Sequence, residues 1–327
     1  MKAIGLISGG LDSVLAVKAI QKQGIEVIAV YFLTPFSKYD SLTIDDSFAR
    51  KFTEKVGCEF RIVELKEDYI KMLKEPKYGY GKNINPCIDC KILMLRKAKA
   101  IMSEVGADFI FTGEVIGQRP MSQNKRTLRV IEKESGLEGL SVRPLSALLL
   151  LETIPEKQGI LKKEFLFDIQ GRSRKKQIEL ANSWQIKGYP WPSGGCALTD
   201  PNFSRRLKDL FKYQQASRHD IELAKIGRYF RISPSFRLTV GRNEQENSKL
   251  MSLAKKEDII FEPLTIPGPT GLGRGVLENA VKFLSSQIIA RYASCEEVEI
   301  RVKTVSDGKE EILSAKGEDC LLNKLRI

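Results

Sequence analysis

The feature that most constrains this chain is a short glycine-containing turn that directly follows an apolar run. Residues 2–7 are typical of a buried strand, and Ser8-Gly9-Gly10-Leu11-Asp12-Ser13 leads from them into a helical pattern that Gly24 ends. In a parallel sheet, ligands bind where strands end and helices begin. The two glycines let the backbone approach an anion, and the helix N-terminus supplies N–H donors and partial positive charge. The turn therefore predicts a phosphate site.

The residue sequence of this turn excludes two common types of nucleotide-binding loop. The sequence has neither a GxxxxGK[ST] nor a GxGxxG string, so the usual nucleoside-triphosphatase loop and a dinucleotide fold are not expected. Ser8 and Ser13 can donate hydroxyl hydrogen bonds to an anion. Asp12 is useful beside phosphate only if Mg²⁺ or a reacting group offsets the repulsion. The alternative is an ordinary strand–turn–helix junction capped by serine.

The rest of the pattern predicts an α/β fold with two domains. Strands alternate with helices, which indicates a doubly wound parallel sheet covered on both faces. Strands are expected at 24–32, 59–64, 107–112 and 141–145, and helices at 45–56, 92–105 and 173–184. Beyond about residue 200 a helix at 202–213 and short strands at 229–232 and 236–240 favour a smaller α+β domain. We therefore expect a catalytic domain at 1–200 and a second domain at 201–327.

Three of the six cysteines form a candidate site for metal or sulfur chemistry. Cys87 and Cys90 open a helix, whose dipole, together with Lys91, should stabilise their thiolates. Cys196 follows the turn-rich stretch 188–195. Three thiolates can bind a [4Fe–4S] cluster and leave one iron open for sulfide. Zinc would normally want four ligands.

Two metal-free readings of these cysteines stay open. Cys90 and Cys196 can relay sulfur as a persulfide and then a disulfide, or the three can be unrelated buried thiols. Asp89 can move protons or cap its helix. No role is expected for the isolated cysteines, which are Cys58, Cys295 and Cys320.

The charge balance points to a polyanionic partner. Lys and Arg total 53 against 41 Asp and Glu, a formal charge of +12, and such a surface attracts nucleic acid unless the excess is merely spread out for solubility. Basic clusters flank the predicted site and should contact RNA phosphates. They contain Arg119, Lys125, Arg126, Lys162, Lys163, Arg172, Arg174, Lys175, Lys176, Arg205 and Arg206. No apolar run approaches the roughly 20 residues of a membrane helix, and no signal peptide is recognisable, so we expect a soluble cytoplasmic protein without membrane contact.

Several strings together resemble a known family. Ser8–Ser13 resembles the pyrophosphatase-type loop (PP-loop) of the adenine nucleotide α-hydrolases, and with Cys87, Cys90 and Cys196 it looks like the tRNA thiouridine synthases. Residues 87–96 resemble the cysteine helix of 4-thiouridine synthases, and residues 112–123 their TGE-x-x-GQ-x-x-SQ loop. The resemblance covers roughly residues 1–200, and the combination is more specific than any one motif.

This resemblance implies a nucleotide site and a set of reactive residues. ATP, with Mg²⁺, would lie on Ser8, Gly9, Gly10, Leu11, Asp12 and Ser13, with Tyr31 and Phe32 beside adenine, and with Thr112, Gly113 and Gln118 lining the nucleotide or target base. Cys90 and Cys196 would transfer sulfur, and Asp12 and Asp89 would be the other catalytic residues. Cys87 completes the CxxC pair that is typical of the cluster-containing branch of the family. Three residues would therefore hold the [4Fe–4S] cluster: Cys87, Cys90 and Cys196.

The implied reaction is ATP-dependent tRNA sulfurtransfer. A uridine oxygen attacks the ATP α-phosphate, pyrophosphate leaves, and sulfur displaces AMP. The string at 112–123 favours 4-thiouridine at tRNA position 8, while 2-thiouridine stays open. An ATP-dependent amide or C–N ligase acting on a small molecule, or an RNA-binding protein with a regulatory nucleotide site, are the competing classes. The sulfur donor would be inorganic sulfide or the persulfide of a cysteine desulfurase, and the protein a monomer or homodimer.

Two departures from the family and one further resemblance concern RNA and sulfur delivery. No RNA-binding extension precedes the loop, which starts at residue 8, and no appended sulfur-carrier domain is recognisable. Residues 240–247 resemble the GRN-x-x-x-N segment of an RNA-binding module of ribosome quality control. Such a module would supply the missing RNA contact, unless this is an unrelated α+β domain.

Overall fold

The computed structural model describes residues 1–36, 56–188, 196–213, 216–293, 297–306, 308–317 and 324–327. The chain divides into two compact units, Met1–Thr199 and Asp200–Ile327, which are described separately. The helix expected at 45–56 and most of the turn-rich stretch 188–195 lie outside the described residues, as do Cys295 and Cys320. None of the described helices is both long and apolar enough to cross a membrane.

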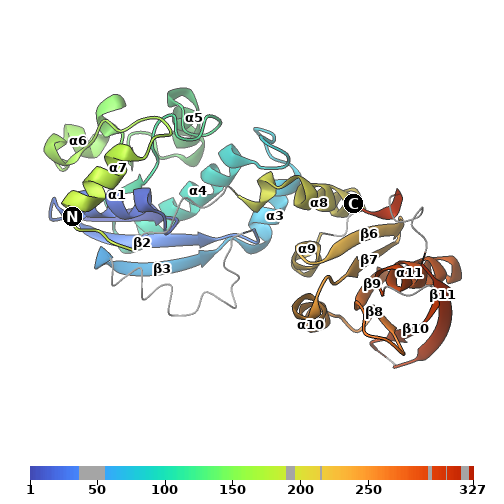
Figure 1. Ribbon diagram of the computed structural model, residues 1–327. Helices are drawn as coiled ribbons and strands as arrows, with labels where there is room; N and C mark the ends of the chain where they lie inside the picture. The colour runs from blue at the N-terminus through green and yellow to red at the C-terminus, as the bar shows by residue number, and fades with distance from the viewer. Residues whose placement is uncertain (37–55, 189–195, 214–215, 294–296, 307, 318–323) are drawn as a thin grey trace. The chain divides into compact units, whose positions relative to one another are not determined.

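The first unit is built on a parallel sheet of five strands (Figure 1). The strands are β1 (Lys2–Ile7), β2 (Glu26–Leu33), β3 (Glu59–Glu64), β4 (Phe109–Thr112) and β5 (Ser141–Val142). Their spatial order is β3-β2-β1-β4-β5, and every neighbouring pair is parallel. The chain therefore leaves β1 toward β2 on one side and later returns to β4 on the other side of β1.

Helices cover both faces of this sheet. They are α1 (Leu11–Gln21), α3 (Lys66–Lys74), α4 (Cys87–Val105), α5 (Lys125–Ser135), α6 (Ile154–Lys157) and α7 (Lys175–Ser183), with single 3₁₀ turns at Ala147–Leu149, Lys163–Phe165 and Ala197–Thr199. Helices α1 and α7 share a core with alternate residues of β1 and β2, such as Ala3 and Ala29. Helix α4 packs on β1 and β4 and carries α3 and α5. The predicted doubly wound α/β class is confirmed, because burial on both faces suits the near-continuous apolar strands.

The second unit is an antiparallel sheet with helices. Its strands are β6 (Arg228–Ser233), β7 (Phe236–Val240), β8 (Ile259–Pro263), β9 (Gly271–Gly275), β10 (Glu297–Thr304) and β11 (Glu310–Lys316), in the order β11-β10-β8-β9-β7-β6. The helices are α8 (Pro201–Lys212), α9 (Arg218–Ala224), α10 (Glu244–Ser252) and α11 (Asn279–Tyr292). Buried side chains such as Phe236, Phe261 and Ile289 join α11 to the sheet. This agrees with the expected α+β character.

The second unit also buries a set of ion pairs. Asp220 of α9 is paired with Arg237 of β7 and with Arg274 of β9, at 2.7 Å for Arg274. Arg274 also binds Asp258 at 2.5 Å. These four side chains, which we call the α9 network, join a helix to two strands of the sheet and to the residue before β8.

Candidate active site

The phosphate loop predicted at Ser8–Ser13 joins β1 to α1. Gly9 has φ +76°, a conformation that favours glycine. Gly10 is the N-cap of α1 in extended conformation, and no described side chain caps the helix there. The Ser13 hydroxyl donates to the Gly10 carbonyl at 2.7 Å. No described side chain thus caps the first N–H groups of α1, and the helix dipole favours negative charge there, which suits the predicted phosphate site.

A second loop, which follows β4, lies against the phosphate loop. The Gln118 side-chain amide donates to Oδ2 of Asp12 at 2.8 Å. A Cβ added to Gly113 would lie 2.6 Å from the nitrogen of Ser13 and 2.7 Å from the Asp12 carbonyl oxygen, so only glycine fits there. Because β1 and β4 are neighbours whose connections leave in opposite directions, this is the switch point where open α/β sheets bind ligands.

Asp12 keeps one oxygen without a partner at this point. Its Oδ1 is buried and has no hydrogen bond among the described residues, whereas Oδ2 is held by Gln118. A buried carboxylate oxygen is costly unless it meets a donor or a cation. Tyr31 and Phe32 are both buried near the carboxyl end of β2, and Tyr31 belongs to the core that contains α1.

The CxxC pair begins α4, as expected. Cys87 is the first residue of the helix, and the Cys90 N–H donates to the Pro86 carbonyl at 2.8 Å. Asp89, which is buried, accepts a hydrogen bond from the Tyr78 N–H at 3.0 Å. The Asp89 carboxylate therefore holds the segment that precedes the helix, a contact that neither of its two predicted roles described.

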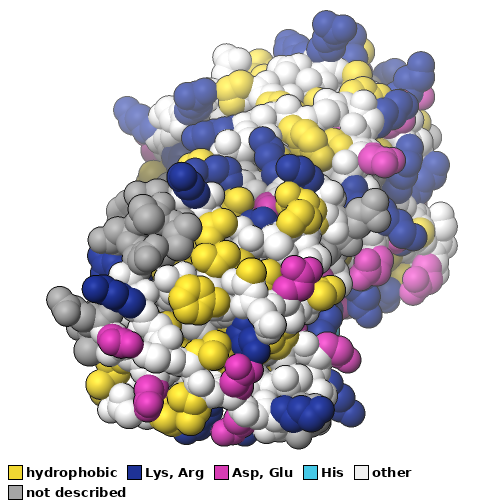
Figure 2. Space-filling view, turned by 90° about the vertical axis from the view of Figure 1, so that its right-hand side faces the viewer, with side chains coloured by type: hydrophobic (Ala, Val, Ile, Leu, Met, Phe, Trp, Pro, Cys, Tyr) yellow, Lys and Arg dark blue, Asp and Glu magenta, His cyan; other side chains and the backbone are white. Residues whose placement is uncertain are grey.

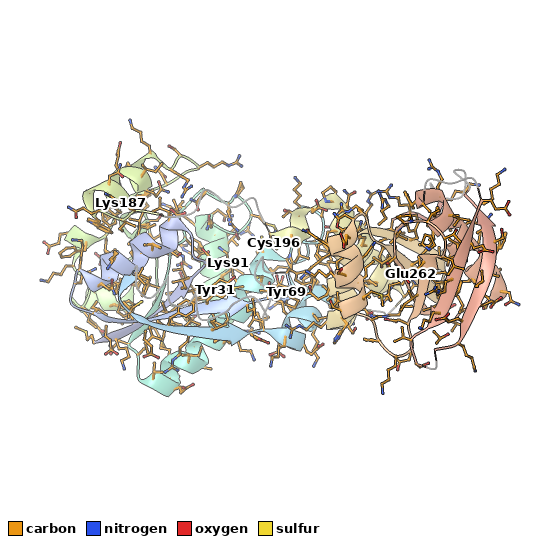
Figure 3. The ribbon with its side chains drawn as sticks, turned by 60° about the horizontal axis from the view of Figure 1, so that its bottom comes forward. Tyr31, Tyr69, Lys91, Lys187, Cys196 and Glu262 are labelled. Carbon is orange, nitrogen blue, oxygen red and sulfur yellow. The ribbon has the colours of Figure 1, made fainter. Side chains whose placement is uncertain are left out.

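A buried tyrosine contacts Cys90 and lies near the other two cysteines. The Tyr69 hydroxyl of α3 donates to Sγ of Cys90 at 3.4 Å, and Tyr69 is 2% exposed. Burial raises the pKa of Tyr69, and the thiols of Cys90, Cys196 and Cys87 raise it further. Figure 3 shows Tyr69 and Cys196 in the same part of the molecule. Because Cys196 also interacts electrostatically with Cys87 and Cys90, three thiols far apart in sequence lie near one another.

Burial controls the protonation of these thiols. It raises the pKa of Cys90 to about 12, although Tyr69 and Lys91 act in the opposite direction. Burial likewise raises the pKa of Cys196, against the effects of the Leu198 N–H and of Arg119. Lys91 stabilises the Cys90 thiolate in the direction that the sequence predicted, but desolvation by burial outweighs this effect.

The predicted metal ligands are the three thiols of Cys87, Cys90 and Cys196. Among the described residues, no group of three or more His, Cys, Asp or Glu side chains is arranged to hold one metal ion. The cysteines of a [4Fe–4S] cluster bind different iron atoms, so their sulfurs need not converge on one point. Three soft thiol donors with a fourth position open therefore fit such a group by their chemistry.

An ion network that sequence reasoning missed connects the cysteine helix with the β4 loop. Lys91 forms an ion pair with Glu114, and Arg143 binds Glu114 at 3.1 Å and also pairs with Glu132. The Thr112 hydroxyl donates to Glu114 at 3.1 Å. Burial, together with Arg143 and Arg119, lowers the pKa of Lys91 to about 7. The only signal in the sequence was the acidic residue of the TGE string.

The predicted RNA contacts are mostly exposed, but several have protein partners. Figure 2 shows Lys and Arg side chains spread over one face, with acidic side chains between them. Lys163 pairs with Glu152 and Lys176 with Asp168. Arg206 donates to the carbonyls of three residues, Ala224, Ile226 and Gly227, so its guanidinium joins α8 to the turn before β6. The exposed ones are Arg119, Lys125, Arg126, Lys162, Lys163, Arg172, Lys175, Lys176 and Arg205, while Arg174 and Arg206 are half-buried.

Two of these basic segments lie beside the site. Arg119 interacts electrostatically with both Lys91 and Cys196. The Gly171 N–H donates to the Ile116 carbonyl at 2.7 Å, which places the start of the 171–176 segment against the β4 loop. The RNA roles stay predictions, but their placement at the carboxyl edge of the sheet suits a polyanion that enters there.

Comparison with known protein families separates the same two parts of the chain. Residues 1–149 match the family described as thiamine biosynthesis protein (ThiI). Residues 227–319 match the family described as NFACT protein RNA binding domain. The first match contains the phosphate loop, the CxxC pair and the Glu114 network, whereas Cys196 lies beyond it.

Individual relatives match mainly the first unit. A probable tRNA sulfurtransferase of Thermococcus kodakarensis is 30% identical over 138 residues, which cover 42% of this chain and 35% of that protein. The tRNA-specific 2-thiouridylase MnmA of Helicobacter hepaticus is 30% identical over 139 residues, covering 41% and 39%. The chain thus spans little more than a third of the length of these relatives.

Solved structures resemble the chain only loosely. A 4-thiouridine synthetase in complex with RNA and ATP is 23% identical and covers 57% of this chain and 51% of its own, with a TM-score of 0.36. That score is too low to support a conclusion about this chain.

Proposed function

We propose that this chain, whose residues 1–149 form a domain of the ThiI family, is an ATP-dependent tRNA sulfurtransferase that replaces a uridine oxygen with sulfur. One observation supports the proposal most strongly: the loop after β4 contacts both the phosphate loop and the helix that carries Cys90. Gln118 binds Asp12 of the phosphate loop, and Glu114, four residues earlier, pairs with Lys91 next to Cys90. Activation by ATP and delivery of sulfur can therefore act on one bound base.

The first step is activation of the base by ATP. The uridine carbonyl oxygen attacks the α-phosphate, and pyrophosphate leaves onto the backbone N–H groups of the Ser8–Ser13 turn. The uncapped start of α1 stabilises the negative charge of this leaving group. Oδ1 of Asp12, which has no described hydrogen-bond partner, is suited to hold Mg²⁺ against the phosphates.

The second step exchanges oxygen for sulfur. Sulfide attacks the activated carbon, the new C–S bond forms, and the C–O bond breaks as AMP leaves. We propose that Cys87, Cys90 and Cys196 hold a [4Fe–4S] cluster, whose open iron position supplies a place for sulfide. The metal-free alternative is a persulfide on Cys90, whose outer sulfur is transferred while Cys196 closes a disulfide with Cys90.

The RNA partner is proposed on two grounds. Residues 227–319 match an RNA-binding domain, and the chain carries a formal charge of +12. The relatives are named both as a tRNA sulfurtransferase and as a 2-thiouridylase. The Thr112–Gln123 string favours 4-thiouridine at tRNA position 8. We expect the enzyme to act in the cytoplasm, where tRNA is available.

The experiment that tests this function measures the thionucleosides of tRNA. Deletion of the gene should remove one thiouridine from total tRNA, and the wild-type chain should restore it. The purified chain, kept anaerobic, should release pyrophosphate when tRNA and ATP are present, and should release AMP and form thiouridine only when sulfide is added as well. Unchanged thionucleosides after deletion would contradict the proposal, and so would pyrophosphate release that depends on a small metabolite and not on tRNA.

Cysteine variants identify the sulfur chemistry. Cys90→Ala and Cys196→Ala should abolish thiolation. Cys58→Ala is the matched control, because this thiol packs against the core of the same unit and directly precedes β3, at the amino end of a parallel strand, so the variant should keep full activity. Iron and sulfide content distinguish the two routes: a cluster requires both elements and their loss in Cys87→Ala, whereas a persulfide enzyme contains neither.

A further inference from the structure

An asparagine joins the segment of Cys196 to the segment that precedes the cysteine helix α4. The Asn83 side-chain amide donates to the Thr199 carbonyl at 2.7 Å, between residues that are 116 positions apart in the sequence. Asn83 lies four residues before Cys87. Thr199 lies three residues after Cys196. One side chain thus connects the two parts of the chain that carry the three thiols.

On one side, this hydrogen bond ends on residues 196–199, which we call the Cys196 turn. Thr199 donates twice to the Cys196 carbonyl, through its N–H at 2.8 Å and through its hydroxyl at 2.7 Å. Leu198, within the turn, is fully buried. Because both Thr199 donors hold the backbone of Cys196, a group that holds the Thr199 carbonyl also restrains Cys196.

On the other side, Asn83 belongs to a turn that is itself fixed. The Gly81 N–H donates to the Asn85 carbonyl at 2.9 Å, and the Asn85 N–H donates to the Lys82 carbonyl at 3.3 Å. A Cβ added to Gly81 would lie 2.1 Å from Sδ of Met121, so this turn packs closely against the loop that follows β4. Asn83 therefore reaches the Cys196 turn from a firm support.

The backbone of Asn83 explains why this residue type suits the position. Its φ is +59°, in the left-handed region where asparagine is found more often than most other non-glycine residues. Glycine would adopt the same conformation but has no side-chain donor. The position thus combines a left-handed backbone with a short amide that donates across to Thr199.

We propose that Asn83 is a positioning residue of the sulfur-transfer site and that it holds Cys196 near the CxxC pair. The inference rests on the proposed function, because sulfur transfer is what requires the three thiols together. Three thiols must reach one cluster in the first route, and Cys196 must reach Cys90 in the metal-free route. A thiol that is held in place starts each turnover within reach of its partner.

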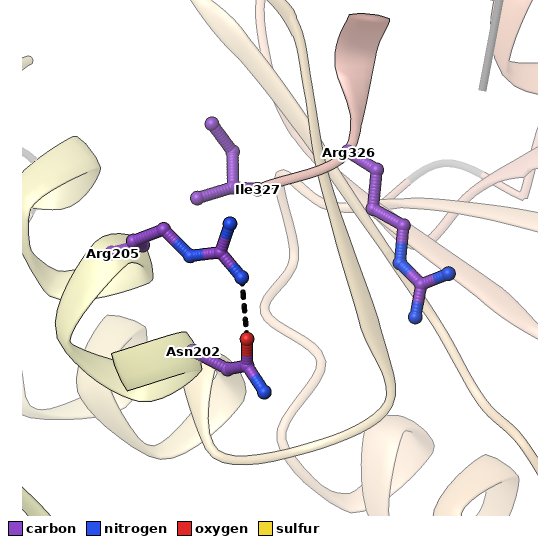
Figure 4. A pocket seen from close by; sticks show the side chains of 4 residues that line it. All are labelled: Asn202, Arg205, Arg326 and Ile327. Carbon is purple, nitrogen blue, oxygen red and sulfur yellow. Dashed lines mark hydrogen bonds between the residues drawn. The ribbon is translucent and has the colours of Figure 1, made fainter. Parts of the chain in front are cut away.

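The hydrogen bond from Asn83 secures the last residue of the first unit. The next residue, Asp200, is the N-cap of α8 in the second unit. In that helix, Asn202 accepts a hydrogen bond from Arg205 (Figure 4). This second asparagine thus bonds within its own helix, whereas Asn83 ties the Cys196 turn to the cysteine helix.

The first test measures disulfide formation and does not depend on activity. The full-length chain, freed of metal with a chelator, is treated with diamide, which oxidises two thiols to a disulfide. Peptide mass spectrometry follows the bonds from Cys196 to Cys87 and Cys90. In Asn83→Gly, which keeps the left-handed backbone, these bonds should form about fivefold more slowly, since one neutral hydrogen bond is lost. Asn83→Asp turns an acceptor toward the Thr199 carbonyl and should slow them at least as much.

The second test separates kcat from KM in tRNA thiolation. In Asn83→Gly and Asn83→Asp, kcat should fall about fivefold or more, in step with the slower disulfide. The KM values for ATP and for tRNA should not change, because the lost contact is at the Cys196 turn and not at the phosphate loop.

Asn202→Gly is the matched control, because the same substitution removes an asparagine whose hydrogen bond stays within α8. It should lose stability, as glycine does in a helix, and keep both the disulfide rate and kcat. Unfolding curves show that each variant is folded at the assay temperature.

Two results would overturn the positioning role. One is that the Asn83 variants match Asn202→Gly in the disulfide rate or in kcat, and the other is that wild type forms no disulfide between Cys196 and the CxxC pair. If wild type forms no thiouridine but Asn83→Gly still slows the disulfide, Asn83 does hold Cys196 and the proposed function fails.

Discussion

Each unit contains a buried network of charged side chains, the α9 network in the second unit and the ion pairs around Glu114 in the first. The two networks differ in whether burial or the neighbouring charges decide the pKa of their members. In the second unit, burial opposes the charge of Asp220, yet Arg237 and the hydrogen bonds from Ser217 and Arg274 outweigh it and lower the pKa of Asp220. In the first unit, desolvation by burial is the largest effect on Lys91, and it lowers the pKa of Lys91 to about 7 despite the ion pair with Glu114.

The difference teaches which network serves the fold. In the α9 network two carboxylates face two guanidiniums across elements of one sheet. The charged forms of Asp220 and Arg274 are favoured, although burial lowers the pKa of Arg237. The Glu114 network holds a lysine whose charge is disfavoured, beside the thiols proposed to carry sulfur. A buried charge that is not fully stabilised is more typical of a functional site than of a structural brace. Five expected outcomes test this contrast, ordered by their effect on the unfolding free energy.

The largest effect is expected from Asp220→Asn. The substitution leaves Arg237 and part of Arg274 buried without their carboxylate, so the unfolding free energy of the second unit should fall by about 3 to 5 kcal/mol. Urea unfolding, followed by a probe in that unit, measures it. Glu310→Gln is the control, because that carboxylate pairs with Lys303 at the exposed surface and should show no measurable change. An equal loss in both variants would mean that burial of the network contributes nothing.

Acid should also weaken the α9 network. The resulting loss of unfolding free energy should not exceed the loss caused by Asp220→Asn. The folded pKa of Asp220 is below its ordinary value of 3.8, so the stabilisation is complete above about that pH and is lost as the pH falls through the lower folded value. Unfolding of the second unit, followed from pH 6 to pH 2, should show this loss in wild type. In Asp220→Asn the decline should be smaller, and equal declines would contradict the assignment.

Most of the contacts that distinguish the two networks could not be predicted from the sequence. The apolar run of β1 predicted its bounds, and the turn after β1 predicted an open helix start, because both are local consequences of residue type. Lys91 and Glu114 are 23 residues apart, and nothing local shows that they meet. The order of the strands and the pairing of Asp220 with Arg274 depend likewise on tertiary packing.

The same limit applies to the thiols. Spacing identified Cys87 and Cys90, but Tyr69 stood in an ordinary amphipathic helix, and only the fold brings its hydroxyl to Cys90. The surroundings of Cys90 were also not visible in the sequence, and their desolvation raises the pKa of this thiol, against the effect of Lys91.

Gly113→Ala should have the next largest effect, at the junction of the two loops. The added Cβ would lie within 2.7 Å of the Asp12 backbone, so the loops must separate. We expect about 1 to 3 kcal/mol of destabilisation and weaker ATP binding. Gly24→Ala is the control, because Gly24 has φ +74° but open space around it, so stability should fall while ATP binding is kept. Normal ATP binding by Gly113→Ala would contradict a nucleotide site here.

Tyr69→Phe should cost about 1 kcal/mol, the value of one neutral hydrogen bond. The Tyr69 hydroxyl lowers the pKa of Cys90, so its loss should raise that pKa further and slow alkylation of Cys90 at a fixed pH. Mass spectrometry of iodoacetamide-treated protein measures the rate at Cys90, with Cys58 in the same sample as the internal reference. A faster reaction of Cys90 would mean that the tyrosine shields the thiol and does not stabilise its anion.

Lys91→Met should change the unfolding free energy least. It is also the variant that tests most directly whether the Glu114 network serves activity, whereas the α9 network serves stability. Removing a buried charge while Glu114 keeps Arg143 and Thr112 as partners should alter stability by less than about 1 kcal/mol in either direction. Thiolation should nevertheless fall at least about tenfold, because Lys91 offsets negative charge on the sulfurs of Cys87 and Cys90.

Lys97→Met supplies the comparison for this variant, since Lys97 lies on the same helix with an exposed ion pair to Asp68. It should keep both stability and thiolation. If Lys91→Met instead loses stability on the scale of Asp220→Asn and thiolates normally, the Glu114 network is a structural brace like the α9 network, and the contrast between the two units disappears.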